Sequence, residues 1–178
     1  VGPTGRSGRD QIADIRALVQ GIVPDERGQI VSIMCQHAPL SHAAALTAAG
    51  ARPVMWKTGH SLIKAKMKEE AAPLAGEMSG HIFFGGDWLG FDDALFAAAR
   101  LCEIVSRGPG GLAALLADLP ETFATPELRV ECSDETKFAI VEAAAAHFAA
   151  LYPVVTIDGV RIRYPDGWGL VRASNTQP

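Results

Sequence analysis

Three side chains with complementary hydrogen-bonding chemistry stand at alternate positions near the middle of the chain: Glu77, Ser79 and His81. Alternate side chains of an extended segment point to the same side, so these groups could face one ligand. A carboxylate, a hydroxyl and a titratable imidazole together accept and donate hydrogen bonds, which suits the vicinal hydroxyls of a sugar. Gly76 and Gly80 flank the motif and permit a sharp bend or the close approach of a ligand.

A second polar cluster, made of Arg172, Ser174, Asn175 and Thr176, follows a Gly-Trp-Gly strand at the end of the chain. A guanidinium group binds phosphate through two parallel hydrogen bonds, and hydroxyl and amide donors can bond the remaining oxygens. Composition alone favours a polar tail.

His60 and His81, with Glu77 as a third donor, are candidates for a metal site. Zinc sites usually place two ligands at short spacing on one element, whereas His60 lies seventeen positions before Glu77. Cys35, Cys102 and Cys132 are widely spaced and form no CxxC or Cys/His zinc pattern. We therefore assign no metal ligands from the sequence.

The bulk properties exclude several classes of function. A formal charge of −4 over 178 residues argues against a general nucleic-acid-binding protein. No apolar run is long enough for a membrane span, and the chain start lacks the apolar region of a signal peptide. An odd number of cysteines favours a reducing cytoplasm over a disulfide framework. An apolar content of 48% is ordinary for a chain that buries a core.

Strands and helices alternate in the first part of the chain, which predicts an α/β domain of three layers around a mostly parallel sheet. A further amphipathic helix is expected from Asp10 to Ile22. The lysines of the helix at 60–70 (Lys64, Lys66 and Lys68) are expected on a solvated face. The predicted strands are 29–35, 52–56, 74–77 and 81–84, and the predicted helices are 41–49, 60–70 and one opened by Asp92 and Asp93.

A Gly- and Pro-rich breaker at 107–111 separates this part from a different pattern. Beyond it the sequence predicts a strand at 128–132, a helix at 134–150 and a hairpin of strands 154–157 and 160–164. The intervening Asp158-Gly159 predicts a two-residue type I′ turn. This order indicates an α+β domain with a mainly antiparallel sheet.

Two blocks of sequence carry a resemblance to a known family. The first holds the Pro-Val-Met-Trp-Lys-Thr-Gly-His stretch at 53–60, the Gly-Glu-Met-Ser-Gly-His motif at 76–81 and the Trp-Leu-Gly-Phe-Asp-Asp stretch at 88–93. It resembles the third domain of the α-D-phosphohexomutases, in the phosphomannomutase/phosphoglucomutase group. The second, Gly-Trp-Gly-Leu-Val-Arg-Ala-Ser-Asn-Thr-Gln-Pro at 167–178, resembles the phosphate-binding loop of the fourth domain.

The resemblance implies interconversion of hexose 1-phosphate and hexose 6-phosphate through a bisphosphate intermediate, with Mg²⁺ and hexose 1,6-bisphosphate required by the whole enzyme. It implies a phosphorylated hexose, of glucose or mannose, as ligand, and N-terminal domains of the same enzyme as partners. The implied sugar-binding residues are His60, Glu77, Ser79 and His81, the implied phosphate-binding residues are Arg172, Ser174, Asn175 and Thr176, and Lys57 is a further candidate for phosphate that could equally be a solvated lysine.

The sequence also departs from the family pattern. The lysine of the family's Val-Lys-x-Thr-Arg type motif would fall near His37, where no lysine stands, so residues 1–43 are expected to be divergent, frame-shifted or simply drifted. Neither the family's serine loop nor its Asp-rich metal loop occurs, and the fourth domain is expected to lack its last strand and helix. The expected domains are a loose tail at 1–8, the third domain at 9–106, a linking region at 107–123 and an incomplete fourth domain at 124–178.

The chain is therefore interpreted as the C-terminal part of such an enzyme, inactive by itself. Two alternatives stay open: a phosphosugar-binding module without catalysis, and part of a phosphoglucosamine mutase. Met78 argues against the latter, because that group typically has Gln at this position.

Overall fold

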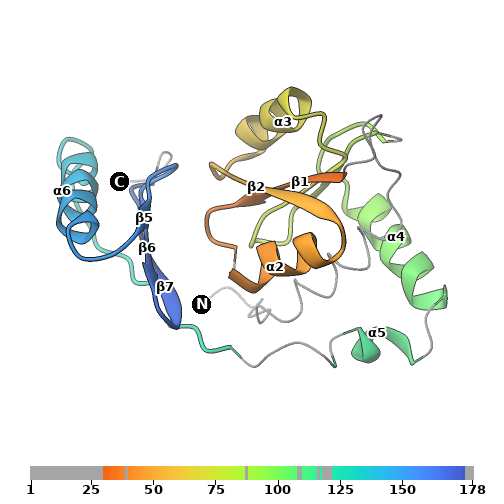
Figure 1. The fold of residues 1–178 in the computed structure, drawn as a ribbon. Coiled ribbons are helices and arrows are strands. Elements are labelled where there is room, and N and C mark those ends of the chain that lie inside the picture. The colour runs from red at the N-terminus through yellow and green to blue at the C-terminus, as the bar shows by residue number, and fades with distance from the viewer. Residues whose placement is uncertain are drawn as a thin grey trace. The chain divides into compact units, whose positions relative to one another are not determined.

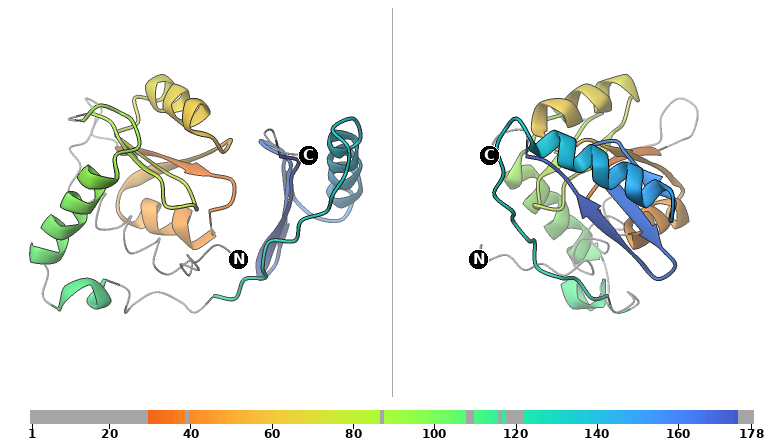
Figure 2. Two further views of the ribbon diagram at one scale, coloured as in Figure 1. Left: turned by 180° about the vertical axis from the view of Figure 1, so that it is seen from behind. Right: turned by 90° about the vertical axis from the view of Figure 1, so that its left-hand side faces the viewer.

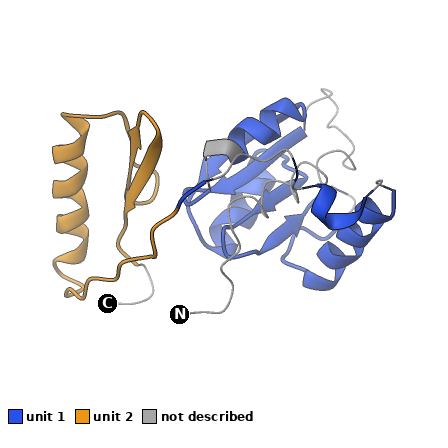
Figure 3. Ribbon diagram, turned by 90° about the horizontal axis from the view of Figure 1, so that it is seen from below, with its two compact units in different colours: residues 1–123 blue, residues 124–178 orange. Residues whose placement is uncertain are grey.

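A computed structural model of the chain describes residues 30–38, 40–86, 88–107, 110–115, 117 and 122–174. The chain divides into two compact units, residues 1–123 and 124–178, which are coloured separately in Figure 3 and are described one at a time below. The expected tail at 1–8 and the expected helix from Asp10 to Ile22 lie outside the described residues.

Unit 1 is built on a four-stranded sheet with the order β2-β1-β3-β4. β1 is parallel to both β2 and β3, and only β4 runs antiparallel to its neighbour β3. The prediction of a mostly parallel sheet is thereby confirmed. The elements are β1 (Ile30–Cys35), α2 (Leu40–Ala48), β2 (Ala51–Trp56), α3 (His60–Glu69), β3 (Leu74–Gly76), β4 (Ile82–Phe84), α4 (Ala94–Arg107) and α5 (Gly111–Ala114).

Helices cover both faces of this sheet, so the predicted three layers are present. All six residues of β1 are buried, as expected for a central strand covered on both sides. Ile30 and Met34 pack with residues of α2 and α4, whereas Val31 and Ile33 pack with residues of α3. Figure 1 shows α2 and α3 on opposite sides of β1 and β2.

Local signals explain where the helices begin and end. Gly50 follows α2 with φ of 83°, the left-handed conformation that commonly terminates a helix. Asp93 Oδ1 accepts hydrogen bonds from the backbone N–H groups of Leu95 and Phe96, at 3.1 and 3.0 Å, and so caps α4. Trp88 stacks on Phe96 with ring centroids 4.0 Å apart, which packs the connection after β4 against α4.

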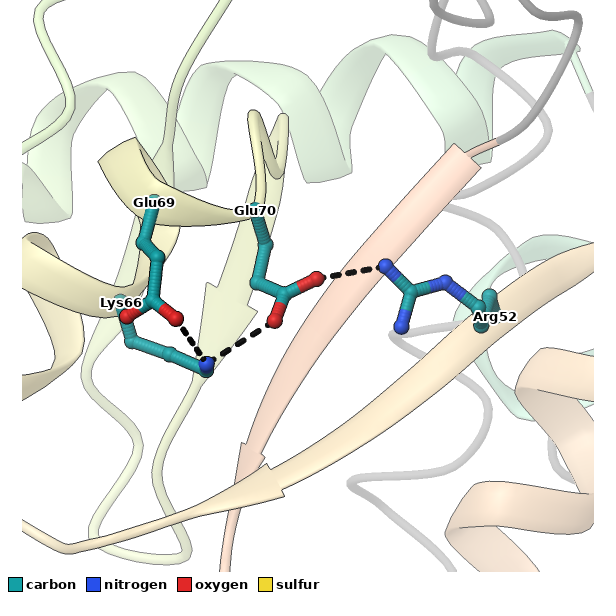
Figure 4. Close-up of polar contacts among 4 residues, drawn as sticks. All are labelled: Arg52, Lys66, Glu69 and Glu70. Atoms are coloured by element: carbon teal, nitrogen blue, oxygen red, sulfur yellow. Dashed lines mark hydrogen bonds and ion pairs between the residues drawn. The ribbon is translucent and has the colours of Figure 1, made fainter.

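The prediction of a fully solvated lysine face on α3 is wrong at one position. Lys66 is only 8% exposed, and its Nζ lies 2.7 Å from Glu69 Oε1 and 2.9 Å from Glu70 Oε1. Arg52 of β2 pairs with Glu70 Oε2 at 2.6 Å, so the four side chains link the end of α3 to an edge strand (Figure 4). Lys66 Nζ also lies 4.4 Å from the ring centroid of Trp56, over whose apolar surface it is buried.

Unit 2 holds α6 (Lys137–Ala149) and a three-stranded antiparallel sheet of β5 (Val154–Val155), β6 (Val160–Tyr164) and β7 (Gly167–Val171). Figure 2 shows α6 lying along this sheet. The predicted antiparallel sheet, helix and hairpin are confirmed. The central strand β6 supplies the buried apolar side chains Val160 and Ile162.

Two details of the unit 2 prediction are wrong. Residues 128–132 form no strand, and their apolar side chains Leu128 and Val130 are 84% and 81% exposed, because no neighbouring strand pairs with them. The Asp158-Gly159 connection is not a two-residue turn. β5 pairs Val155 with Arg161, a register that places more residues in the connection than a type I′ turn allows.

Across the described residues, none of the helices is both long and apolar enough to traverse a lipid bilayer.

Candidate functional site

The strand order of unit 1 gathers three connections at one edge of the sheet. β1, β2 and β3 are parallel, so their carboxyl ends at Cys35, Trp56 and Gly76 meet at the same edge. The chain moves from β1 to β2 on one side and then to β3 on the other. In open α/β sheets, ligands bind outside the carboxyl ends of the strands at such a switch point.

The predicted sugar motif lies in one of these connections, but its backbone is not extended as predicted. Residues 77–81 form the turn between the antiparallel strands β3 and β4. Glu77 N–H donates to the carbonyl of His81 at 2.9 Å, and Gly80 N–H donates to the carbonyl of Glu77 at 3.0 Å. Gly80 has φ of 93°, a backbone conformation that is strained for any residue with an L side chain. The turn, rather than strand alternation, brings the side chains together.

Glu77 is held by the neighbouring connection. Its Oε1 accepts a hydrogen bond from the backbone N–H of Gly59, at 2.9 Å, immediately before α3 begins at His60. Its Oε2 accepts from Ser79 Oγ at 3.3 Å, and Ser79 is exposed. The carboxylate is therefore oriented by the start of a helix while its partner hydroxyl stays accessible to a ligand.

The two histidines of the motif lie against each other. The ring centroids of His60 and His81 are 4.5 Å apart with an interplanar angle of 72°, and His60 also meets the ring of Phe83 edge-on at 5.2 Å. His81 Nδ1 donates to Asp92 Oδ2 at 2.5 Å. Asp92 is brought there by a bridge to Phe83 of β4. Donation from Nδ1 leaves Nε2 as the His81 ring nitrogen that can accept a proton or a metal.

Glu77, His60 and His81 each offer one ligand atom, and these atoms all lie within 4.8 Å of one another. Seventeen positions of sequence separate His60 from Glu77, and for that reason no metal ligands were assigned from the spacing. The parallel pairing of β1 with β2 and β3 removes that separation in space. Lys57, the further candidate for phosphate binding, is exposed and directly follows the carboxyl end of β2.

Sequence reasoning missed several residues of this edge. Thr58 Oγ1 lies 3.3 Å from His37 Nδ1, which links the β1 and β2 connections. Met78 N–H donates to Cys35 Sγ at 3.3 Å, which links the turn to β1. Burial is the main cause that raises the pKa of the Cys35 thiol, so it stays protonated. The sequence signal that could have identified these residues is their position at or just after the carboxyl ends of predicted strands.

In unit 2, the structure describes two of the four predicted phosphate-binding residues. Arg172 Nε donates to Asp158 Oδ2 at 2.8 Å, with side chains 25% and 10% exposed. Ser174 follows two residues later and is half-buried. Asn175 and Thr176 lie outside the described residues.

Gly159 permits the Asp158–Arg172 contact. It has φ of 88°, and a Cβ there would lie 2.4 Å from the carbonyl oxygen of Val171 and 2.9 Å from Cα of Arg172. Only glycine lets the β5–β6 connection approach the end of β7 this closely.

Comparison with protein-family models gives two matches that together cover most of the chain. The model of phosphoglucomutase/phosphomannomutase alpha/beta/alpha domain III matches residues 25–123. The model of the phosphoglucomutase/phosphomannomutase C-terminal domain matches residues 127–178.

Relatives and solved structures agree with these matches. A phosphomannomutase/phosphoglucomutase of Pseudomonas syringae pv. tomato is 56% identical over 131 residues, which are 72% of this chain and 28% of that protein. The Pseudomonas aeruginosa protein of the same name is 52% identical over 136 residues, 76% of this chain and 29% of that protein. The chain thus spans less than a third of the length of these relatives. A phosphoglucomutase/phosphomannomutase family structure from Burkholderia thailandensis superposes with a TM-score of 0.79 at 43% identity, covering 96% of this chain and 35% of that one.

Proposed function

Because the chain belongs to the phosphoglucomutase/phosphomannomutase family and carries its domains III and IV, we propose that it supplies ligand-binding groups for the interconversion of hexose 1-phosphates and hexose 6-phosphates. Unit 1 recognises sugar hydroxyls, and unit 2 binds a phosphate group that is not being transferred. The observation that carries this proposal is the convergence of Glu77, His60 and His81 at the carboxyl edge of a parallel sheet.

The chemistry of unit 1 suits hydroxyl recognition. Glu77 is fixed by the Gly59 N–H, and a carboxylate has lone pairs left to accept hydrogen bonds from two neighbouring hydroxyls. Ser79 can donate to or accept from the ligand. The His81 tautomer set by Asp92 presents an accepting Nε2, and exposed His60 adds a second ring.

The chemistry of unit 2 suits a dianion. Arg172 is held at the end of β7 by one nitrogen, Nε, which leaves the terminal guanidinium nitrogens for phosphate oxygens. Ser174, Asn175 and Thr176 would add neutral donors. Lys57 of unit 1 remains a further candidate for an anionic ligand.

Magnesium does not fit the residues of this chain that the structure describes. The candidate ligand set found among them, His60, Glu77 and His81, offers two nitrogens and one carboxylate, whereas Mg²⁺ prefers an all-oxygen octahedron. We place the magnesium site that the reaction requires, and the phosphoryl-carrying serine, in other parts of the enzyme, together with a hexose 1,6-bisphosphate intermediate. A cytoplasmic location is part of the same proposal.

Calorimetry with glucose 1-phosphate, mannose 1-phosphate and inorganic phosphate tests the two assignments separately. Arg172→Ala should weaken binding of all three ligands by about 1.5 to 3 kcal/mol, because it removes a charge-assisted contact to phosphate. Glu77→Ala should weaken only the two sugar phosphates. Exposed Arg163 and Glu142 provide matched controls, and Arg163→Ala and Glu142→Ala should leave all three affinities unchanged.

A parallel change of all three affinities in Glu77→Ala and Arg172→Ala would contradict the division into a hydroxyl site and a phosphate site. Unchanged affinities in both variants would reject the proposed binding residues altogether.

A further inference from the structure

We propose that His60, Glu77 and His81 form a binding site for a divalent late first-row metal ion such as zinc. The site rests on the geometry of the three side chains and does not depend on the proposed function. Its effect on sugar binding does rest on that function, because the same groups are proposed to bind hydroxyls.

The distances between the donors are close to what zinc requires. The three ligand atoms lie within 4.8 Å of one another. In a tetrahedral site with bonds of about 2.0 to 2.2 Å, neighbouring ligand atoms are roughly 3.4 Å apart. A side-chain rotation can shorten the remaining distance between the ligand atoms. His60 can make this rotation because it is exposed and is the first residue of α3.

The surroundings orient two of the three ligands in advance. His81 donates from Nδ1 to the carboxylate of Asp92, at 2.5 Å, which makes Nε2 the coordinating atom. A carboxylate behind a ligating histidine is the usual support of zinc sites. Glu77 receives the Gly59 N–H on Oε1 at 2.9 Å, which fixes the plane of its carboxylate without using all of its lone pairs.

The donor set selects the class of ion. Two imidazoles and one carboxylate, with a fourth position open to water or ligand, match the zinc sites that keep one exchangeable position. Mixed nitrogen and oxygen donors favour late first-row ions over magnesium or calcium. A zinc ion bound here would occupy the Glu77 and histidine atoms proposed for the sugar hydroxyls. Zinc and sugar should therefore compete.

The test uses the full chain with Cys102→Ser and Cys132→Ser as background, which removes the exposed and partly exposed thiols as competing ligands. Titration calorimetry with zinc chloride, and the visible absorption of added cobalt(II), should show one ion per chain with the spectrum of a nitrogen- and oxygen-bound ion. His60→Ala or His81→Ala should abolish both signals. His147→Ala, at an exposed histidine of α6, should change neither.

Asp92→Asn tests whether the carboxylate behind His81 contributes to metal binding or the three ligands are close only by chance. It leaves all three ligands in place and removes only the support behind His81, and it should lower zinc affinity about 10- to 100-fold. Circular dichroism of each variant checks that the fold is retained. The proposal would be overturned if the chain with the unmodified site bound no zinc. It would also be overturned if zinc binding persisted in His60→Ala and His81→Ala, or if the zinc affinity were unchanged in Asp92→Asn.

Failure of this inference and failure of the proposed function are distinguishable. Zinc binding without any loss of glucose 1-phosphate affinity would support the metal site and contradict the sugar assignment. If sugar binding depends on Glu77 but the chain binds no zinc, the sugar assignment is supported and the metal site is contradicted.

Discussion

Arg172 and Asp158 form an ion pair, with Nε donating to Oδ2 at 2.8 Å, that joins the end of β7 to the β5–β6 connection. The pair fixes the guanidinium group that we propose as the phosphate ligand. Its partial burial distinguishes it from solvent-exposed ion pairs, which contribute little to stability.

Asp158→Asn should lower the free energy of unfolding of unit 2 by about 1 to 3 kcal/mol, because it leaves a partly buried guanidinium without its anionic partner. Amide hydrogen exchange of residues 154–171 measures the change. Asp166→Asn removes an exposed carboxylate between β6 and β7 and serves as the control. Equal protection in both variants would show that the Arg172–Asp158 pair contributes nothing.

Gly159→Ala should destabilise unit 2 by at least about 2 kcal/mol, because the new Cβ would overlap the carbonyl oxygen of Val171 and the φ of 88° strains an alanine. Gly167→Ala is the matched control, since a Cβ at that glycine meets no atom within 4 Å. Urea unfolding followed by circular dichroism compares the two variants. Similar midpoints would contradict the close approach of the two backbone segments.

His42 should make the stability of unit 1 depend on pH. Burial lowers the pKa of His42 from 6.5 to about 4, and its Nδ1 has no hydrogen-bond partner. Between these values the unfolded state binds a proton that the folded state does not. The free energy of unfolding should therefore fall by up to about 3 kcal/mol as pH decreases from 6.5 to 4.

His42→Leu should remove this part of the pH dependence while retaining a side chain of similar size. Urea unfolding at pH 7.5 and pH 4.5 on both proteins measures the difference. If the two proteins lose the same stability on acidification, His42 is not the titrating group.

The Lys66 network should stabilise unit 1 over a broad pH range. Hydrogen bonds that Lys66 donates to Glu69 and Glu70 raise the pKa of Lys66, and the contacts with Arg52 and then Lys66 lower the pKa of Glu70. The Glu70 contribution should be complete above pH 4.5 and lost as pH falls through its lowered pKa. The Lys66 contribution should be complete below pH 10.5 and lost as pH rises through its raised pKa.

Lys66→Met should therefore lower the melting temperature at pH 7 more than Lys64→Met, whose lysine is exposed on the same helix. Differential scanning fluorimetry at pH 7 ranks the two variants. Equal melting temperatures would indicate that Lys66 contributes no more to stability than a solvated lysine, as the sequence predicted.

Most of the fold of unit 1 was predictable because its signals are local. The apolar run of β1, interrupted only by Ser32, and the glycine after α2 identify a buried strand and a helix end without any tertiary information. Burial of Lys66 was not predictable. It depends on Arg52, Glu70 and the Trp56 ring, which are brought together when α3 packs against the sheet.

The candidate site was predictable in its members but not in its geometry. Glu77, Ser79 and His81 were identified from their chemistry, although the backbone is a turn and not a strand. Asp92 was assigned to a helix start, a role that Asp93 performs, and its bond to His81 could not be foreseen from a spacing of eleven residues. In unit 2, the strand predicted at 128–132 is absent, because a local sequence pattern does not show whether a partner strand lies beside it.

The hydrogen bond from Met78 to Cys35 makes the thiol an intrinsic probe of how often the edge of the sheet opens. Cys35 is 1% exposed, so a thiol reagent can reach it only when the turn at 77–81 separates from β1. Exposed Cys102 reacts without such an event and reports the reagent's intrinsic rate. The ratio of the Cys35 and Cys102 labelling rates therefore gives the equilibrium constant for opening of the turn at 77–81, which carries residues proposed to bind ligand.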